Sequence, residues 1–150
     1  MLASKVNGAW NLHVLTRELT LDFFVLFSSA SALIGSQGQG NYAAANAFLD
    51  ALAWYRRLDG RPALSIDWGP WAEAGMAASH AAGLGDRLKA FGVELIPAGE
   101  GLIALERLME ADSAQQAVLH ADWSIFGQRL GGMAGPSLTG DLVRQAGDAA

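Results

Sequence analysis

Two short apolar runs on either side of one long helical pattern constrain the fold of this chain more than any other feature. The run Phe23–Phe27 is aromatic and β-branched, and Ala63–Trp68 is a second short run that Gly69 and Pro70 close. Between them, residues 41–58 are rich in alanine and carry their larger apolar side chains on one side, as an amphipathic helix does. A strand, a helix and a second strand in this order predict a right-handed crossover and a parallel sheet, so the expected fold class is α/β.

Further segments on both sides extend this unit. Because the first run is apolar at every position, we expect a strand that is buried on both faces of the sheet. Residues 4–19 predict a preceding helix with Ser4 as its N-cap, and Ala117–Ala121 predicts a third strand. The other expected segments are a loop over residues 69–83, a short helix over 86–91, and a helix from Pro97 with Leu102, Leu105, Leu108 and Met109 on its apolar face. We expect one domain over residues 1–130 and a flexible tail or linker over 131–150.

The composition excludes several classes of protein. The chain has 150 residues, 51% of them hydrophobic, which is enough to bury the core of one domain. It has no cysteine, which rules out disulfides, thiolate metal sites and a cysteine nucleophile, and the three histidines are too far apart to predict a metal site. The net charge of −5 argues against nucleic acid as a partner. No apolar run is long enough to cross a membrane, and we expect a cytoplasmic protein.

Polar side chains that could bind a ligand or take part in catalysis cluster around the carboxyl end of the first predicted strand. Ser28 and Ser29 follow that strand, and sites of α/β proteins form at such ends. A glycine-containing loop then leads to a helix that carries Tyr42 and, one turn later on the same side, Asn46. Lys5 lies at the start of the preceding helix. Each residue alone has an ordinary structural explanation, as a turn former, packing residue or surface group, but together they bring a hydroxyl, a phenol, an amide and an ammonium within reach of one another.

The stretch Leu26–Asp50 resembles the catalytic stretch of ketoreductase domains in modular polyketide synthases, which are members of the short-chain dehydrogenase/reductase superfamily. The segment Ser65–Trp71 (Ser-Ile-Asp-Trp-Gly-Pro-Trp) is similar to the segment that follows in that family. Most short-chain dehydrogenases have lysine four residues after the catalytic tyrosine, whereas polyketide ketoreductases exchange lysine and asparagine, as Asn46 and Lys5 do here. The resemblance covers roughly residues 3–126 and implies the C-terminal half of a Rossmann-like parallel sheet with flanking helices.

This resemblance implies the catalytic set Lys5, Ser29, Tyr42 and Asn46. Reduction of a ketone needs a hydride on carbon and a proton on the developing alkoxide, and Tyr42 is expected to be the general acid. Ser29 would donate a hydrogen bond to the carbonyl oxygen, and Lys5 would make Tyr42 a better acid because an ammonium favours the phenolate. Asn46 would hold a water molecule or Lys5 in a proton relay.

The resemblance also implies the cofactor and the partners. The cofactor is NADPH, with Lys5 at the nicotinamide ribose, Tyr42 beside it, and Gly69 and Pro70 near the nicotinamide, while Trp71 is expected to touch the substrate. That substrate is a β-ketoacyl thioester on the phosphopantetheine of an acyl carrier protein, and other polyketide synthase domains are further expected partners. Ile34 stands where one stereochemical class of the family has tryptophan, so the handedness of the product stays open.

No glycine-rich turn for a pyrophosphate precedes Lys5. We therefore expect a fragment whose nucleotide-binding half is missing, which is an enzyme only when that half completes it. A non-catalytic remnant with a structural or interaction role is the alternative, and epimerisation by the same residues is a third possibility. The missing half predicts an exposed edge of the sheet, at which a partner strand would pair.

Overall fold

A computed structural model describes residues 2–36, 38–72 and 84–130 of this chain, and the chain divides into two compact units. The first unit is formed by Met1–Gly69 and Leu102–Val118, and the second by Pro70–Gly101 and Leu119–Ala150. The predicted tail over 131–150 and most of the predicted loop over 69–83 lie outside the described residues. Within the described ranges, no helix has the length and apolar character needed to span a bilayer.

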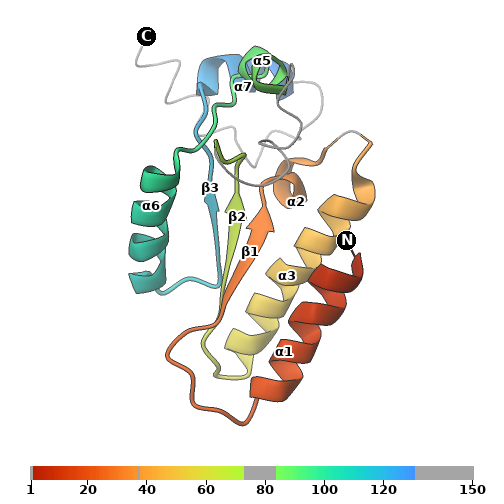
Figure 1. Cartoon of the computed structure of the whole chain (residues 1–150), viewed down its shortest axis with the longest axis vertical. Coiled ribbons are helices and arrows are strands. Elements are labelled where there is room, and N and C mark those ends of the chain that lie inside the picture. Colours follow the sequence, from red (N-terminus) through yellow and green to blue (C-terminus); the bar gives the residue numbers. More distant parts are fainter. Residues whose placement is uncertain (1, 37, 73–83, 131–150) are drawn as a thin grey trace. The chain divides into compact units, whose positions relative to one another are not determined.

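The first unit is built on a three-stranded parallel sheet with the strand order β1-β2-β3 (Figure 1). The strands are β1 (Val25–Ser29), β2 (Leu64–Trp68) and β3 (Gln115–Val118). β2 is buried at every position; it has a neighbouring strand on each side and contacts α3. The predicted α/β class with parallel strands is thereby confirmed. Because the strands are parallel, their carboxyl ends, where sites of α/β proteins form, lie at the same end of the sheet.

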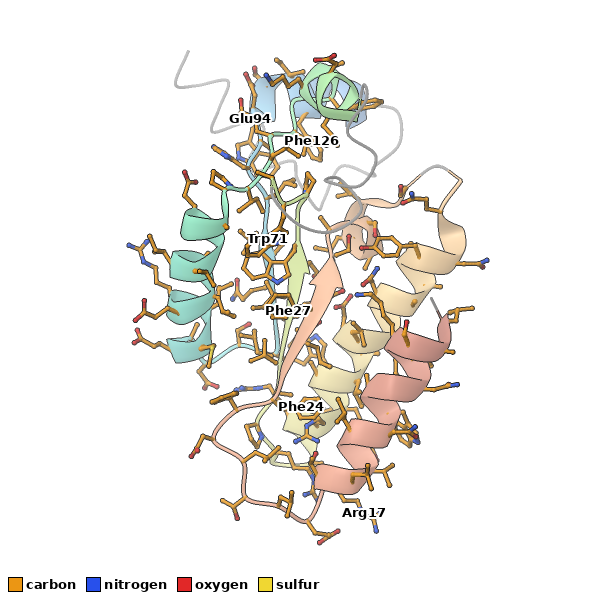
Figure 2. The ribbon with its side chains drawn as sticks, viewed as in Figure 1. Arg17, Phe24, Phe27, Trp71, Glu94 and Phe126 are labelled. Carbon is orange, nitrogen blue, oxygen red and sulfur yellow. The ribbon has the colours of Figure 1, made fainter. Side chains whose placement is uncertain are left out.

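β1 differs from the predicted strand in its position and in its burial. It begins two residues later than Phe23, so Ser28 and Ser29 are its last two residues and do not follow it. Leu26 and Ser28 are buried, but Phe27 is 48% exposed, and its ring lies 5.6 Å from that of Trp68. Figure 2 labels Phe27 on β1. The prediction of burial on both faces is therefore wrong for β1, which is an outer strand of the described sheet.

The outer edge of β1 can be derived from its hydrogen bonds to β2. Phe24 O accepts a hydrogen bond from Leu64 N, and Ala30 N donates one to Trp68 O, so the even-numbered residues of this segment direct their backbone groups toward β2. Because the direction alternates along a strand, the backbone groups of Phe27 face the opposite, outer edge. Among the described strands this edge has no neighbour.

The long helix of the crossover agrees with its prediction, and the first helix does so in part. α3 (Gly40–Leu58) ends at Asp59, and Gly60 follows with a left-handed φ of 71°. The chain begins with a π-helix, η1 (Ala3–Asn7), which continues as α1 (Gly8–Thr16) and so ends three residues before the predicted boundary. Ser4 lies inside η1 and does not cap it.

α1 and α3 lie side by side along one face of the sheet (Figure 1). Apolar residues from α1, β1, α3 and the start of β2 form the core of this unit: Ala9, Leu26, Leu49, Leu52, Ala53 and Ala63, with Phe24 and Phe48 packed against them. A short helix, α2 (Ser31–Ile34), follows β1 where only a glycine-containing loop was predicted. Because α2 begins two residues after the end of β1, the chain changes direction directly after Ser29.

The remaining helices are α5 (Leu84–Ala90), α6 (Ala98–Glu110) and α7 (Trp123–Leu130). The predicted short helix corresponds to α5 and the helix from Pro97 to α6, whereas α7 was not predicted. The predicted apolar face of α6 is only partly buried, since Leu102 is 61% and Met109 41% exposed. The third strand, β3, begins two residues before its predicted start at Ala117.

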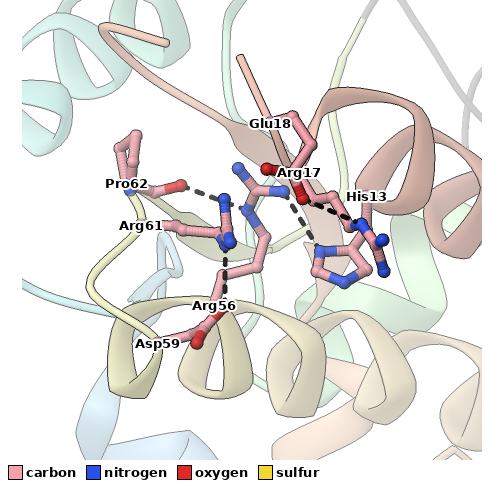
Figure 3. Close-up of polar contacts among 7 residues, drawn as sticks. All are labelled: His13, Arg17, Glu18, Arg56, Asp59, Arg61 and Pro62. Carbon is pink, nitrogen blue, oxygen red and sulfur yellow. Dashed lines mark hydrogen bonds and ion pairs between the residues drawn. The ribbon is translucent and has the colours of Figure 1, made fainter. Parts of the chain in front are cut away.

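A buried arginine joins α3 to α1 in the first unit (Figure 3). Arg56 is 1% exposed, its Nε donates to Pro62 O at 3.2 Å, and its guanidinium lies 3.8 Å from the centre of the Phe24 ring. Its Nη1 lies 3.2 Å from Nδ1 of His13. Arginine only donates hydrogen bonds, so the Nδ1 atom accepts, and the neutral imidazole carries its proton on Nε2.

This arrangement predicts a stability that falls in mild acid. Burial lowers the pKa of His13, and the positive charges of Arg56, Arg61 and Arg17 lower it further, against a smaller opposite effect of Asp59. The unfolded chain therefore binds a proton at His13 more readily than the folded chain, and the contribution of His13 to the free energy of unfolding decreases as the pH falls below about 6.5.

Urea unfolding of the parent and of His13→Gln at pH 7.5 and pH 5 measures this effect. The glutamine variant does not titrate, so we expect it to lose less stability between the two pH values than the parent does. An equal loss in both proteins would contradict the assignment.

Candidate active site

One hydrogen bond ties the carboxyl end of β1 to α3, and a second lies within the first turns of that helix. Ser28 is buried on the inner face of β1, and its Oγ donates to the backbone oxygen of Asn46 at 3.2 Å. The side chain of Asn46 turns back along the helix, and its Nδ2 donates to Tyr42 O at 2.8 Å. Together these contacts fix the position of Tyr42 and Asn46 along the helix axis relative to the last residues of β1.

Lys5 reaches the same place from η1. Its Nζ donates to the backbone oxygen of Phe27 at 2.8 Å and lies 5.9 Å from the centre of the Tyr42 ring. This separation is within the range of a cation–π contact. Burial lowers the pKa of Lys5, while the negative charge of Asp50 raises it in part. An ammonium group and a phenol from distant parts of the sequence are thereby neighbours, as the sequence predicted.

Ser29 is the last residue of β1, and its hydroxyl oxygen accepts hydrogen bonds from the chain that follows. Its Oγ accepts hydrogen bonds from Ser31 N at 3.3 Å and from Ser31 Oγ at 3.1 Å. Both contacts use the oxygen as acceptor and leave the hydroxyl proton of Ser29 for another acceptor. The chain then passes Gly35 and Gly38, whose φ angles of 76° and 75° need the conformational freedom of glycine, before α3 begins.

Asn46 has an unusual environment for an amide. Its side chain is fully buried, and its Oδ1 has no hydrogen-bond partner within the described part of the chain. An unpaired oxygen of this kind costs about 1–3 kcal/mol, which a water molecule or another donor would recover. Lys5 has three N–H donors and uses one on Phe27 O, so two are left for hydroxyl groups of a ligand. Such donors are of the kind that the ribose of a nicotinamide nucleotide needs, the ligand that the resemblance implies.

The predicted cofactor and substrate residues after β2 belong to two units. Gly69 lies in the first unit, where its backbone N–H donates to Val118 O at 2.7 Å. Pro70 and Trp71 lie in the second unit, where Pro70 O accepts from Ile96 N at 2.8 Å and Trp71 forms a parallel bridge with Ile96. The indole ring of Trp71 packs directly over Gly101, where a Cβ atom would overlap it.

This packing predicts that Gly101→Ala displaces the Trp71 ring. Overpacking of this kind costs about 1–3 kcal/mol, more than the gain from replacing a helical glycine by alanine. We expect a lower unfolding midpoint in urea and a change in tryptophan fluorescence. The matched control is Gly99→Ala in the same helix, because a Cβ atom at Gly99 meets nothing within 4 Å. A loss of stability in the control that equals the loss in Gly101→Ala would contradict the prediction.

The sequence did not single out a group of polar residues next to this site: the buried Asp50, Ser65 and Asp67, and the partly buried Gln115. Two residue spacings could have predicted this group, but only when the helix and the strand are considered together. Asp50 follows Asn46 by four residues on the helix, and Ser65 and Asp67 alternate along β2. The described ranges hold no group of three or more His, Cys, Asp or Glu side chains placed to bind a metal ion.

Comparisons with known proteins identify the family. The sequence model of the KR domain matches residues 1–73. Mycoketide-CoA synthase of Mycobacterium tuberculosis is 39% identical over 144 residues, which cover 95% of this chain and 4% of that protein. Erythronolide synthase EryA2 of Saccharopolyspora erythraea is 50% identical over 102 residues, or 68% of this chain and 3% of that protein.

Solved structures show the same likeness in three dimensions. The structure titled "Structure of A-type Ketoreductases from Modular Polyketide Synthase" is 41% identical, has a TM-score of 0.86, and is matched over 95% of this chain and 30% of its own. A C2-type ketoreductase from a modular polyketide synthase is 32% identical, with a TM-score of 0.82, over 97% of this chain and 31% of its own. The chain thus spans about a third of the solved ketoreductases and a small part of the curated relatives. These findings do not favour a purely structural remnant, and the chain belongs to the ketoreductase domains of modular polyketide synthases, within the short-chain dehydrogenase/reductase superfamily.

Proposed function

We propose that this chain is the catalytic part of a ketoreductase domain that reduces a β-ketoacyl thioester to a β-hydroxyacyl thioester with NADPH. Ketoreductases of this superfamily depend on a pyridine nucleotide. The observation that carries the proposal is the position of the Lys5 ammonium beside the Tyr42 ring at the end of β1, with Ser29 as the last residue of that strand. The proposal places the protein in the cytoplasm, in keeping with its lack of cysteine.

The proposed roles follow from the contacts of each residue. NADPH, when bound, supplies the hydride for the carbonyl carbon. Tyr42 donates its phenolic proton to the carbonyl oxygen, and the Lys5 ammonium beside the ring favours the phenolate that remains. The free hydroxyl proton of Ser29 forms a hydrogen bond to the same oxygen and stabilises its developing negative charge. Asn46, with its unpaired Oδ1, holds a water molecule through which Tyr42 regains a proton.

The partners belong to the same proposal. The two further N–H donors of Lys5 bind the nicotinamide ribose next to Tyr42, and Gly69 and Pro70 lie near the nicotinamide. Trp71 contacts the substrate. The substrate is held on the phosphopantetheine of an acyl carrier protein, and the other domains of a polyketide synthase surround the reductase, since the matched region is only 4% of one relative and 3% of the other.

The test is reconstitution with the part that the solved relatives contain in addition. The purified chain is mixed with the N-terminal half of a polyketide ketoreductase and a β-ketoacyl thioester, and the absorbance of NADPH is followed. We expect oxidation that needs both parts, that is faster with NADPH than with NADH, and that is faster with a carrier-bound thioester than with a small soluble one. No turnover above that of the N-terminal half alone would refute the reductase function.

A further inference from the structure

One side of α3 carries polar groups from the proposed active site into the core. Tyr42, Asn46, Asp50 and Trp54 follow one another at intervals of four residues and therefore lie in one row along the helix. Asn46 is fully buried and Asp50 is 7% exposed. A row that packs against a sheet in the core of a domain is normally apolar, so these two polar residues require an explanation.

The sheet faces this row with a matching set of polar groups. Ser65 and Asp67 alternate along β2 and therefore point to the same face, and both are fully buried. The strand register places Ser28 of β1 beside Asp67, and Gln115 of β3 beside Ser65. Ser28 is hydrogen-bonded to α3, which shows that this polar face of the sheet is the one that α3 covers.

Two carboxyl groups meet between these layers. Ser65 Oγ donates to Asp50 Oδ1 at 2.6 Å, and Gln115 Nε2 donates to Asp67 Oδ2 at 2.8 Å. Trp54 Nε1 in turn donates to Gln115 Oε1 at 3.2 Å. Asp67 lies within hydrogen-bonding range of Asp50, yet its Oδ1 has no donor within the described residues. In the same residues, no arginine or lysine forms an ion pair with either carboxyl.

Two carboxylates this close, without a cation between them, are not both ionised at little cost. A proton on Asp67 removes the repulsion between the two carboxylates. The protonated Oδ1 atom of Asp67 then donates a hydrogen bond to Asp50, which joins β2 to α3. We propose that Asp50 and Asp67 form a proton-sharing pair that holds α3 on β2, and that they are thereby positioning residues for Tyr42 and Lys5. The positioning role rests on the proposed reductase function, whereas the shared proton does not.

The electrostatics of the neighbouring groups agree with this geometry. Burial raises the pKa of Asp67 to about 6, with smaller lowering effects from Gln115 and Ser28 and a further rise from Asp50. Within the described residues, the charged group that faces the pair is Lys5 on η1, whose charge interacts with that of Asp50 on α3. β1 and β3 contribute the neutral residues Ser28 and Gln115. Protonation of Asp67 therefore changes the negative charge that Lys5 experiences.

The first experiment observes the proton in the chain itself, without cofactor or substrate. Carboxyl 13C NMR of aspartate-labelled protein, assigned with Asp67→Asn, follows each aspartate from pH 3 to pH 8. We expect Asp67 to titrate near pH 6 in the parent and at a lower pH in Asp50→Asn, which removes its carboxylate neighbour but leaves the effect of burial. The control is Asp22→Asn at an exposed position, which leaves the titration of Asp67 unchanged. An Asp67 that titrates near pH 4 in the parent overturns the proposal even if every variant fails to fold.

The second experiment tests whether the pair reaches the active site. The chain has two lysines, so Lys89→Arg with 13Cε-lysine labelling leaves Lys5 as the only lysine signal. We expect this signal to shift with the midpoint of Asp67, and the shift to vanish in Asp67→Asn but to persist in Asp22→Asn. A Lys5 chemical shift that does not change as Asp67 titrates overturns the positioning role of the pair. Failure of the proposed reductase function is a separate result, because it appears only in the reconstituted activity assay.

Discussion

Tyr42→Phe is expected to lower the rate of NADPH-dependent reduction by the reconstituted domain about 10²–10⁴-fold, the usual contribution of a general acid. The phenyl ring preserves the packing beside Lys5, whereas the proton for the developing alkoxide is lost. Binding of the nucleotide should change little, so the effect belongs to kcat. The absorbance of NADPH at saturating substrate measures it directly.

The matched control is Tyr55→Phe, because Tyr55 is the only other tyrosine of the chain and lies on the same helix. Its ring is 52% exposed and meets His13 edge-on at 5.6 Å between ring centres, a contact that phenylalanine retains. We expect the control to keep nearly the full rate. If Tyr42→Phe keeps more than about half of the parent rate, well outside the range for a lost general acid, then Tyr42 is not the acid.

Arg56→Met is expected to destabilise the folded chain by about 2–3 kcal/mol, the largest loss of stability among the substitutions considered. Methionine fills part of the space but leaves Pro62 O and His13 Nδ1 without their donor and removes the guanidinium from the Phe24 ring. Unpaired acceptors in a buried place carry most of this cost. Urea unfolding at neutral pH, followed by circular dichroism, measures the difference.

The adjacent arginine provides the control for this substitution. Arg57 forms an ion pair with Asp112, which is 92% exposed, and pairs of this kind contribute less than about 1 kcal/mol. Arg57→Met should therefore change the free energy of unfolding by a fraction of the Arg56→Met effect. Equal losses in the two variants would show that the buried contacts of Arg56 contribute nothing beyond charge.

The elements that the sequence predicted best are those with two independent signals. α3 and β2 lie within one residue of their predicted bounds, because the helix has both apolar periodicity and the stop at Asp59 and Gly60, and β2 is closed by Gly69 and Pro70. β1 had only its apolar run, and the run included Phe23, which is 62% exposed and precedes the strand. An apolar run marks the presence of a strand, but the hydrogen bonds of the neighbouring strand decide where it begins.

The order of the predicted elements allowed Lys5 and Tyr42 to meet at one strand end, and the resemblance then implied their roles, since no periodicity links residues so far apart in the sequence. The Asp50–Asp67 pair escaped prediction for a different reason. Each aspartate alone is typical of an exposed position, and their burial follows from the register of β2 against β1 and from the rotation of α3 over the sheet. Neither of these quantities can be read from a single helix or strand.

The bond between Lys5 and the backbone oxygen of Phe27 has a consequence for assembly. That oxygen faces the outer edge of β1, where the amide of an added parallel strand would seek its acceptor. A strand that docks there competes with the lysine side chain for this oxygen, and a displaced Lys5 would have all three of its N–H donors for a ligand beside Tyr42. Addition of a strand at this edge of the sheet would thus also change the hydrogen bonds of the Lys5 ammonium group beside Tyr42.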